Sequence, residues 1–298
     1  MSKAAGRLLR GSIAADQFRL FAADTSAIVQ RARDLHDLYP LPTILMGRLI
    51  SAVALMSGEL KAPNSEISLR IDAEGPLRGA IAIADMAGDI KAYAFEPQLW
   101  MEEPSANLQV GKHLLPGTLS VIRQIGMKSP YTGQIKLIDG EIASDVAAYY
   151  EQSEQTATAV NLGVLMDPNA AIRSAGGVLI QQMPNADPAL AEIISSNLQN
   201  TPNVSDLMDM GLSIEDILER FILKDLSWKI VKETTLRYHC DCSRERFARA
   251  LLLLGKNELM SMREGIAPLC NYCNKSYHFD AEDIDNLIEA LDKQYEKQ

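Results

Sequence analysis

The first part of the chain mixes segments of alternating polarity with segments of helical periodicity. Residues 67–71 and 79–83 alternate apolar with other residues around a Glu-Gly-Pro turn signal, which predicts a β-hairpin. Apolar residues at helical spacing predict helices over residues 27–36 and 42–60, and a further helix is expected at 141–152 after an Asp-Gly turn. Further strand-like segments lie at 131–138 and 178–182. Helices combined with antiparallel strands place this part of the chain in the α+β class.

Beyond Pro184 the pattern becomes that of amphipathic helices. Asp187 followed by Pro188 is a typical helix start, and Ser213 with Asp216 three residues later forms a capping box at the start of a second helix. The two apolar stripes consist of Leu190, Ile193, Ile194 and Leu198 in the first helix and Ile214, Ile217, Leu218 and Phe221 in the second. Short helices cannot bury an apolar stripe alone, so they should either dock on the preceding domain or pack on each other as a helical hairpin.

The sequence therefore predicts three parts. Residues 1–184 form an antiparallel-sheet and helix core domain, residues 185–236 a helical linker, and residues 237–298 a small C-terminal domain closed by a helix after Asp280. A segment of roughly sixty residues buries too little surface to be comfortably stable on its own. The C-terminal domain is therefore expected to depend on an additional stabilising element.

Composition restricts the class of protein. Hydrophobic residues make up 47% and charged residues 23% of the chain, as in ordinary globular proteins. The net charge of −10 and the pI near 5.0 argue against a nucleic-acid partner, since binding to phosphates needs a basic surface. The N-terminal residues contain no apolar run long enough for a signal peptide, and the most apolar stretch, 41–60, is interrupted by Arg48. We therefore expect a cytoplasmic protein without a membrane partner.

The chemistry of the chain is concentrated in its four cysteines. All lie in the predicted C-terminal domain, as the pairs Cys240/Cys242 and Cys270/Cys273. Four sulfur ligands are the tetrahedral environment that a structural Zn²⁺ ion favours, so we expect one zinc ion per chain. Inert buried thiols and two structural disulfides are the alternatives, but scattered core thiols would not pair in this way, and a reducing compartment disfavours permanent disulfides. A thioredoxin-type redox pair is less expected, since no βαβ pattern surrounds the second pair.

The first pair has an unusual spacing. Ordinary zinc ribbons use two CxxC motifs, whereas only Asp241 separates Cys240 from Cys242. A disulfide between such neighbours would be strained, and strained disulfides have the more oxidising potentials of labile or regulatory bonds. The spacing therefore suggests a reversible switch. Basic residues nearby in sequence either offset the charge of a thiolate cluster or simply solvate the surface: Arg237, Arg244, Arg246, Lys256 and Lys275.

Loss of the metal has a predictable consequence for neighbouring segments. A structural zinc ion contributes binding free energy on the order of 10 kcal/mol to folding, so its removal should unfold the C-terminal domain. Oxidation of the thiols should have the same effect, because a disulfide sulfur is a poor zinc ligand. The apolar surface then exposed is expected on the linker helices, at Ile193, Ile194, Leu218 and Phe221.

These motifs resemble those of a known family. Residues 240–247 and 270–277 are similar to the zinc signatures of the redox-regulated chaperones called heat shock protein 33, and the resemblance extends over nearly the whole chain. Segments of the core domain that also resemble this family are 75–77, 131–133, 140–143, 149–150, 153–155 and 175–177, followed by Gln181. Ala92, where glycine is expected, and residues 111–117 depart from the family pattern without touching the zinc site.

The resemblance implies a function for the chain. It implies a holdase that is inactive while reduced and zinc-bound and becomes active when oxidation forms the disulfides Cys240–Cys242 and Cys270–Cys273 and releases zinc. It further implies unfolding client proteins as partners under oxidative stress, a homodimer in the oxidised state, and no catalytic residue. Activity without ATP is also implied, and the sequence accordingly contains no GxxxxGK[ST] loop.

The competing hypothesis is an enzyme or a binding protein whose zinc module is purely structural. Its candidate catalytic groups are His36, expected on a helix surface, and His113, expected in a loop, and solvated side chains explain both more simply. The sequence contains no nucleophile elbow, metal triad or Gly-rich dinucleotide motif. A zinc-ribbon module for nucleic acid conflicts with the acidic charge and with the CxC spacing.

Overall fold

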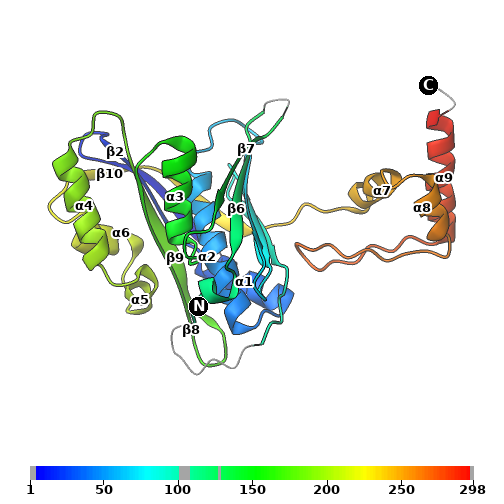
Figure 1. The fold of residues 1–298 in the computed structure, drawn as a ribbon, viewed down its shortest axis with the longest axis horizontal. Coiled ribbons are helices and arrows are strands. Elements are labelled where there is room, and N and C mark those ends of the chain that lie inside the picture. Colours follow the sequence, from blue (N-terminus) through cyan, green and yellow to red (C-terminus); the bar gives the residue numbers. More distant parts are fainter. Residues whose placement is uncertain (1–4, 101–107, 127–128, 296–298) are drawn as a thin grey trace. The chain divides into compact units, whose positions relative to one another are not determined.

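The computed structural model describes residues 5–100, 108–126 and 129–295, and the chain forms two compact units, Met1–His239 and Cys240–Gln298 (Figure 1). The combination of a large sheet with helices confirms the predicted α+β class. The finer division of the first unit into a core domain and a linker at residue 184 stays a prediction.

The first unit is built on one ten-stranded sheet with the strand order β7-β6-β3-β4-β5-β10-β1-β2-β9-β8. Its strands are β1 (Gly6–Ile13), β2 (Phe18–Asp24), β3 (Glu66–Ala73), β4 (Gly79–Asp85), β5 (Asp89–Ala94), β6 (Gly117–Gln124), β7 (Tyr131–Lys136), β8 (Thr158–Met166), β9 (Ile172–Gln182) and β10 (Trp228–Tyr238). Within the described residues, the paired strands are antiparallel except for β10 and β5. The predicted hairpin is confirmed as β3–β4.

Helices cover this sheet. They are α1 (Ser26–His36), α2 (Pro40–Ser57), the short turn η1 (Val110–His113), α3 (Ala143–Glu154), α4 (Pro188–Asn200), α5 (Val204–Asp209), α6 (Ile214–Ile217) and the π-helical turn η2 (Leu218–Ile222). The helices predicted at 27–36, 42–60 and 141–152 are thus confirmed, with small shifts at their ends. By length and composition α2 could cross a membrane, but 89% of it is buried inside the unit, so it is the central core helix.

Strand β10 differs from the sequence-based prediction, since we expected a helical linker as far as residue 236. It pairs with β1 over residues 228–236 and with β5 only at its last two residues. Ile230 and Val231 on β10 are 44% and 60% exposed, so polarity does not alternate along it as it does along a half-buried strand. Its hydrogen-bonding partner β1 lies at the opposite end of the unit's sequence, where no local signal reveals the pairing.

The second unit is much smaller. It consists of helices α7 (Arg244–Leu252), α8 (Lys256–Ser261) and α9 (Ala281–Tyr295) and of an irregular hairpin between α8 and α9 with bridges at Ile266–Phe279 and Leu269–Ser276. Its buried core consists of Leu251, Leu259, Tyr277, Phe279, Ile284 and Leu291. So small a core agrees with the expectation that this unit needs an additional stabilising element.

Helices α4 to η2 dock on the sheet of the first unit. On β2, Phe21 and Ala23 belong to the core cluster formed with α1 and α2, whereas Phe18, Leu20 and Ala22 belong to the cluster formed with α4 to η2. Successive strand residues point to opposite faces, so this part of the sheet is covered by helices on both sides. Both arrangements left open by the sequence are observed, since the helices dock on the sheet and α4 also packs on η2, where the Asn197 amide donates to the Ile222 carbonyl.

Burial along the predicted apolar stripes is uneven. Ile194 is 3% exposed, Leu218 is fully buried, and Phe221 is partly buried against the same cluster. Ile193 is 44% exposed, so the expectation that it shares the buried stripe is wrong. The reason is helical geometry: Leu190, Ile194 and Leu198 recur every four residues on one face, and the residue before Ile194 is turned away by about 100°.

Helix α5 approaches the sheet closely over two glycines. Gly163 on β8 pairs with Gly176 on β9. A Cβ atom at Gly163 would lie 2.4 Å from Ser205 Oγ and 2.9 Å from the Ser205 amide nitrogen. Ser174 Oγ donates a hydrogen bond of 2.7 Å to the Ser205 carbonyl. Only glycine at position 163 therefore permits α5 to sit at this depth.

Replacing Gly163 by alanine is expected to displace α5 and to destabilise its docking by about 1–3 kcal/mol, because overpacked contacts cost this much. Hydrogen exchange should become faster over residues 204–209 and stay unchanged in β3 and β4. Thr158→Ser on the same strand is the matched control, since it adds no atom near α5. Unchanged exchange over 204–209 in Gly163→Ala would show that this contact does not determine the docking of α5.

Candidate metal centre

The cysteines come from two segments of the second unit. Cys240 and Cys242 lie in the extended segment before α7, and Cys270 and Cys273 lie at the tip of the irregular hairpin. The amides of Cys273 and Asn274 both donate to the Cys270 carbonyl, at 3.3 and 2.8 Å. Asn274 has φ of 53°, a left-handed conformation that asparagine adopts more readily than most residues. These bonds close the CxxC segment into a tight turn.

All four sulfur atoms lie within 4.8 Å of one another, and none forms a disulfide. Cys240 Sγ is 3.7 Å from Cys270 Sγ, and Cys242 Sγ is 3.3 Å from Cys273 Sγ. A tetrahedron with Zn–S bonds of about 2.3 Å has edges of roughly 3.8 Å, so the spacing fits four ligands of one ion. Both contacts join one cysteine of the first pair to one of the second, so these distances do not select a disulfide pairing.

The electrostatics of the cluster favour a bound cation. Burial raises the pKa of Cys240, and burial together with the neighbouring thiols raises the pKa of Cys273 to about 11. Burial acts in the same direction on Cys242, but hydrogen bonds from Tyr277 and from the other thiols outweigh it and lower the pKa of this thiol. The protein alone thus makes Cys242 easier to deprotonate and makes Cys240 and Cys273 harder to deprotonate. A coordinated metal ion removes this limit, because a coordinating thiol is deprotonated outright.

Four of the five basic residues near the cluster in sequence are paired with carboxylates, and Arg237 pairs with Asp89 and Lys256 with Asp292. Arg246 Nη1 lies 2.6 Å from Asp241 Oδ2. Arg244 pairs with Asp283, and its guanidinium lies 4.6 Å above the centre of the Phe279 ring. Arg244 therefore connects the start of α7 to the hairpin and to α9. These contacts favour a structural role for Arg244 and Arg246 over compensation of thiolate charge.

Tyr277 is a residue of the centre that sequence reasoning missed. Its hydroxyl lies 2.8 Å from the Cys242 carbonyl oxygen and 3.1 Å from Cys242 Sγ. The returning strand of the hairpin carries Tyr277 to Cys242, although 35 residues separate the two in the chain. The only signal in the sequence is an aromatic residue shortly after the last cysteine.

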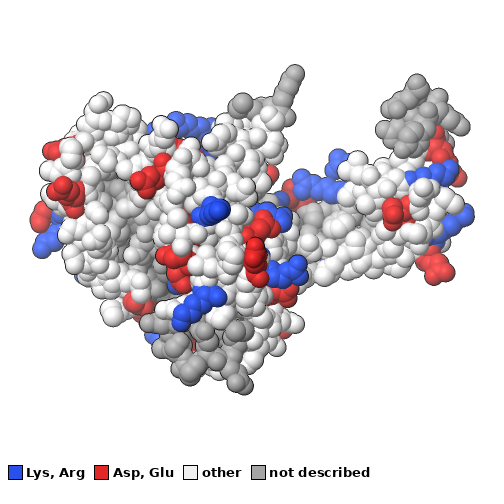
Figure 2. Space-filling model, viewed as in Figure 1, with Lys and Arg blue, Asp and Glu red and all other residues white. Residues whose placement is uncertain are grey.

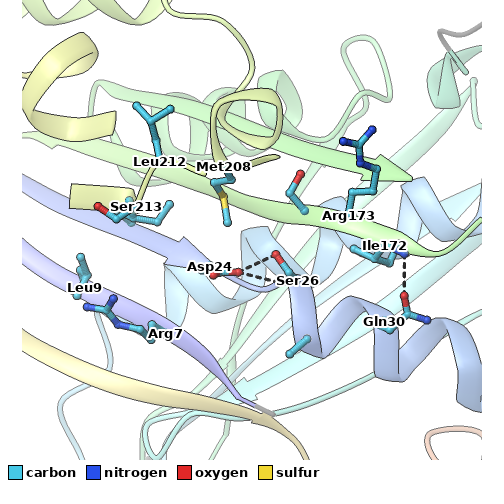
Figure 3. Close-up of a pocket in the computed structure, with 14 residues that line it drawn as sticks. Arg7, Leu9, Asp24, Ser26, Gln30, Ile172, Arg173, Met208, Leu212 and Ser213 are labelled. Atoms are coloured by element: carbon cyan, nitrogen blue, oxygen red, sulfur yellow. Dashed lines mark hydrogen bonds between the residues drawn. The ribbon is translucent and has the colours of Figure 1, made fainter. Parts of the chain in front are cut away.

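The α5–α6 segment of the predicted linker also borders a cavity of about 470 Å³ in the first unit (Figure 3). Residues of β1, β2, β9, α1 and the α5–α6 segment line it. Arg7 contacts Glu215 on α6 and Glu233 on β10, each at 2.7 Å, and Arg173 contacts Asp209 on α5 at 2.5 Å. Arg7 and Arg173 are about half exposed, and ion pairs in such positions stabilise a fold only slightly. The docking of α5 and α6 therefore depends mainly on their apolar contacts.

The two histidines considered as catalytic candidates are buried. His36 is 8% and His113 is 7% exposed, so the expectation of solvated side chains is wrong. His36 Nε2 lies 3.1 Å from the Tyr238 hydroxyl, which donates to the Ala92 carbonyl. His36 thus joins α1 to the end of β10, which is a structural role.

Charges of both signs are interspersed on the surface. Figure 2 shows Lys and Arg close to Asp and Glu on each unit. On the face in view, the described residues form no continuous basic area of the kind that phosphate binding requires. The face in view therefore gives no support to a nucleic-acid module.

Comparison with known proteins gives consistent matches over both units. The family model described as Hsp33 protein matches residues 6–280, which include all four cysteines. A 33 kDa chaperonin from Acetivibrio thermocellus is 37% identical over 291 residues, which cover 96% of this chain and 98% of the relative. A 33 kDa chaperonin from Desulforamulus reducens is 35% identical over 290 residues, with the same coverage of 96% and 98%.

A solved structure has a similar fold. The crystal structure of the 33 kDa chaperonin, a heat shock protein 33 homolog, from Thermotoga maritima superposes with a TM-score of 0.86. The sequences are 28% identical, and the match covers 96% of this chain and 99% of that chain.

Proposed function

The chain belongs to the Hsp33 family, whose curated relatives are named 33 kDa chaperonins, and on this premise we propose that it is a redox-regulated, ATP-independent holdase. In the reduced state Cys240, Cys242, Cys270 and Cys273 bind one Zn²⁺, and the protein is inactive. Oxidation releases zinc, loosens the second unit and the linker helices, and exposes apolar surface. The observation that carries the proposal is the convergence of four sulfur atoms within 4.8 Å in a unit with a very small core.

Zinc is the ion that suits this set of ligands. Thiolates are soft ligands, and a closed tetrahedral set of four is typical of structural zinc. When bound, zinc keeps the four sulfurs as thiolates and contributes its binding free energy to the folding of the second unit. The hairpin turn holds Cys270 and Cys273, and Tyr277 holds Cys242, in the positions that such a site requires.

Oxidation changes the thiols themselves. Two cysteine thiols transfer two electrons and two protons to one molecule of hydrogen peroxide, which forms one S–S bond and two molecules of water. Two such reactions consume all four ligands. The proposed disulfides are Cys240–Cys242 and Cys270–Cys273, and two arguments support them: the resemblance to the family, and the short loops within each pair, which close more readily than the loop over residues 243–269.

The helices α4 to η2 are the proposed bistable element. Their apolar contacts through Ile194, Leu218 and Phe221 hold them on the sheet, helped only slightly by the half-exposed ion pairs. The segment includes the π-helical turn Leu218–Ile222, a rare geometry that is frequent at functional sites. When the helices loosen, these side chains and the sheet residues beneath them become available to unfolding client proteins.

The proposed setting is the cytoplasm, where a reducing environment keeps the thiols reduced until oxidative stress. The oxidised protein is proposed to act as a homodimer, and the support for this is the family resemblance. The alternative is an enzyme or binding protein with a purely structural zinc module. His36 and His113, its candidate groups, are buried in the core. A structural module gives no gain of chaperone activity on oxidation, which separates the two hypotheses.

Freshly reduced protein is expected to contain one zinc ion per chain, because the sequence offers one set of four sulfur ligands. Metal analysis of the purified protein measures this directly. Cys242→Ser combined with Cys270→Ser should lose the ion, whereas His278→Ala should retain it. A content near zero in reduced wild-type protein, or full retention in the double variant, would rule out the proposed ligand set.

Hydrogen peroxide is expected to produce disulfides within each pair. Non-reducing peptide mapping of the oxidised protein checks this, with alkylated reduced protein as the control for disulfides formed during handling. A map dominated by the linkages Cys240–Cys270 and Cys242–Cys273 contradicts the proposed pairing, since it would mean that the short sulfur–sulfur distances of the intact cluster, and not loop length, select the partners.

Oxidation is expected to abolish hydrogen-exchange protection over α4 to η2 and beyond Cys240, while the sheet of the first unit stays protected. Suppression of the aggregation of an unfolding test protein should appear in parallel. Leu218→Ser combined with Phe221→Ser should undock the helices and give partial activity without oxidant. Met210→Ser is the matched control, because Met210 is 74% exposed in the same segment.

Two results would count against this proposal. Equal activity before and after oxidation would exclude a redox switch. If the oxidised protein is active while the amides of Leu218 and Phe221 stay protected from hydrogen exchange, the client-binding surface must lie elsewhere.

A further inference from the structure

Tyr277 makes a contact at the cysteine cluster that is specific to one sulfur. Its hydroxyl oxygen lies 3.1 Å from Cys242 Sγ and 2.8 Å from the carbonyl oxygen of the same residue. The side chain is 7% exposed, and its ring packs against Phe247 with 4.9 Å between the ring centres. Packing therefore fixes the hydroxyl beside Cys242.

The hydrogen bonds to two other sulfurs come from the backbone. The amide of Cys242 donates to the Cys240 sulfur, and the amide of Lys275 donates to the Cys273 sulfur. In both cases the donor lies two residues beyond the sulfur. The chain enters α7 directly after Cys242, with Ser243 as N-cap. For the Cys242 sulfur, the hydrogen-bonding contact comes from a side chain of the hairpin, that of Tyr277.

We propose that Tyr277 is a positioning residue of the metal centre, whose hydroxyl hydrogen bond fixes the Cys242 sulfur and lowers its reactivity toward peroxide. The proposal rests on the zinc site proposed above and adds a residue that determines how readily this site opens. The hydroxyl donates to the Cys242 carbonyl oxygen, and the Cys242 sulfur, which carries no proton when it binds zinc, is a second acceptor within reach, so the hydroxyl restricts the rotation of that side chain.

The chemical consequence follows from the first step of oxidation. The Cys242 thiolate attacks one oxygen of hydrogen peroxide, the S–O bond forms as the O–O bond breaks, and the departing hydroxide takes the remaining proton to give a sulfenate and water. The new S–O bond forms from a lone pair of the Cys242 sulfur. A hydrogen bond to this sulfur stabilises the lone pair and so makes the sulfur less nucleophilic. Removal of the hydroxyl should therefore accelerate this step at Cys242 and leave the other sulfurs nearly unaffected.

The test is Tyr277→Phe in the full-length, zinc-loaded protein, because this change removes one oxygen and keeps the ring that packs on Phe247. Alkylation of each cysteine by iodoacetamide is followed by mass spectrometry, and zinc release by peroxide is followed with a chromogenic chelator. The ratio of the Cys242 rate to the Cys273 rate should rise about five-fold, as expected for the loss of one hydrogen bond of ordinary strength. Zinc release should accelerate. Tyr131→Phe, at an exposed tyrosine of the first unit, should change neither quantity.

Each outcome decides the question. An unchanged ratio, or an equal acceleration at all four cysteines, overturns the proposal, because general loosening of the unit affects every thiol. If Tyr277→Phe does not hold zinc, Phe247→Leu is the deciding variant, since it loosens the ring packing and keeps the hydroxyl. Zinc retained in Phe247→Leu supports the role of the hydroxyl, and zinc lost from both variants overturns it.

Failure of the proposed function would look different. Wild-type protein that binds no zinc contradicts the zinc site, and the role of Tyr277 falls with it. Wild-type protein with one zinc ion and an unchanged Cys242/Cys273 ratio contradicts only the role of Tyr277.

Discussion

Four sulfur atoms within 4.8 Å of one another can all carry negative charge only if a cation compensates it. Without one, burial and the neighbouring thiols raise the pKa of Cys240 and Cys273, and Cys242 is the sulfur that the hydrogen bonds leave more acidic. The hairpin, α7 and α9 contribute only a small apolar core to the same unit. The folding of this unit is therefore thermodynamically linked to the ionisation of its thiols, and a bound metal ion would favour the folded state.

The ion pairs of the first unit differ in how much they stabilise its sheet and its helices α4 to η2. Arg123 on β6 is largely buried and contacts Glu59 at 2.6 Å and Glu154 at 2.8 Å. It therefore connects β6 to α3 and to the turn that follows α2, in a setting where loss of one partner is costly. Arg7, which ties α6 to β10, is 45% exposed and contributes far less. Helices α4 to η2 thus lie on a rigid sheet but depend on apolar contacts and on the shape of the surface beneath α5. A segment of this kind can open while the sheet remains intact.

The features that could be predicted from the sequence are those that local residues determine. Asp187 accepts a hydrogen bond from the Ala189 amide, and Ser213 and Asp216 form the capping box, because helix starts depend on residues within one turn. The convergence of the four cysteines could also be predicted, since their spacing is itself the signal. Strand β10 could not, because its partner β1 is far away in the sequence and its exposed apolar residues hide the strand pattern. The contact of Tyr277 with Cys242 could not be predicted for a similar reason, because it depends on the register of the hairpin and not on neighbouring residues in the sequence.

The pairing of β1 with β10 also affects how the protein folds during its synthesis on the ribosome. Arg7 on β1 and Glu233 on β10 are 226 residues apart in the chain, and their side chains contact each other in the finished sheet. At ribosomal speeds of 5–20 residues per second, roughly 10–45 s pass between the synthesis of these two strands. During that time one edge of β1 presents unpaired N–H and C=O groups, which are a template for pairing with other chains. The nascent polypeptide therefore spends most of its synthesis with an open sheet edge, and factors that cover extended segments at the ribosome would act on it before its own fold can.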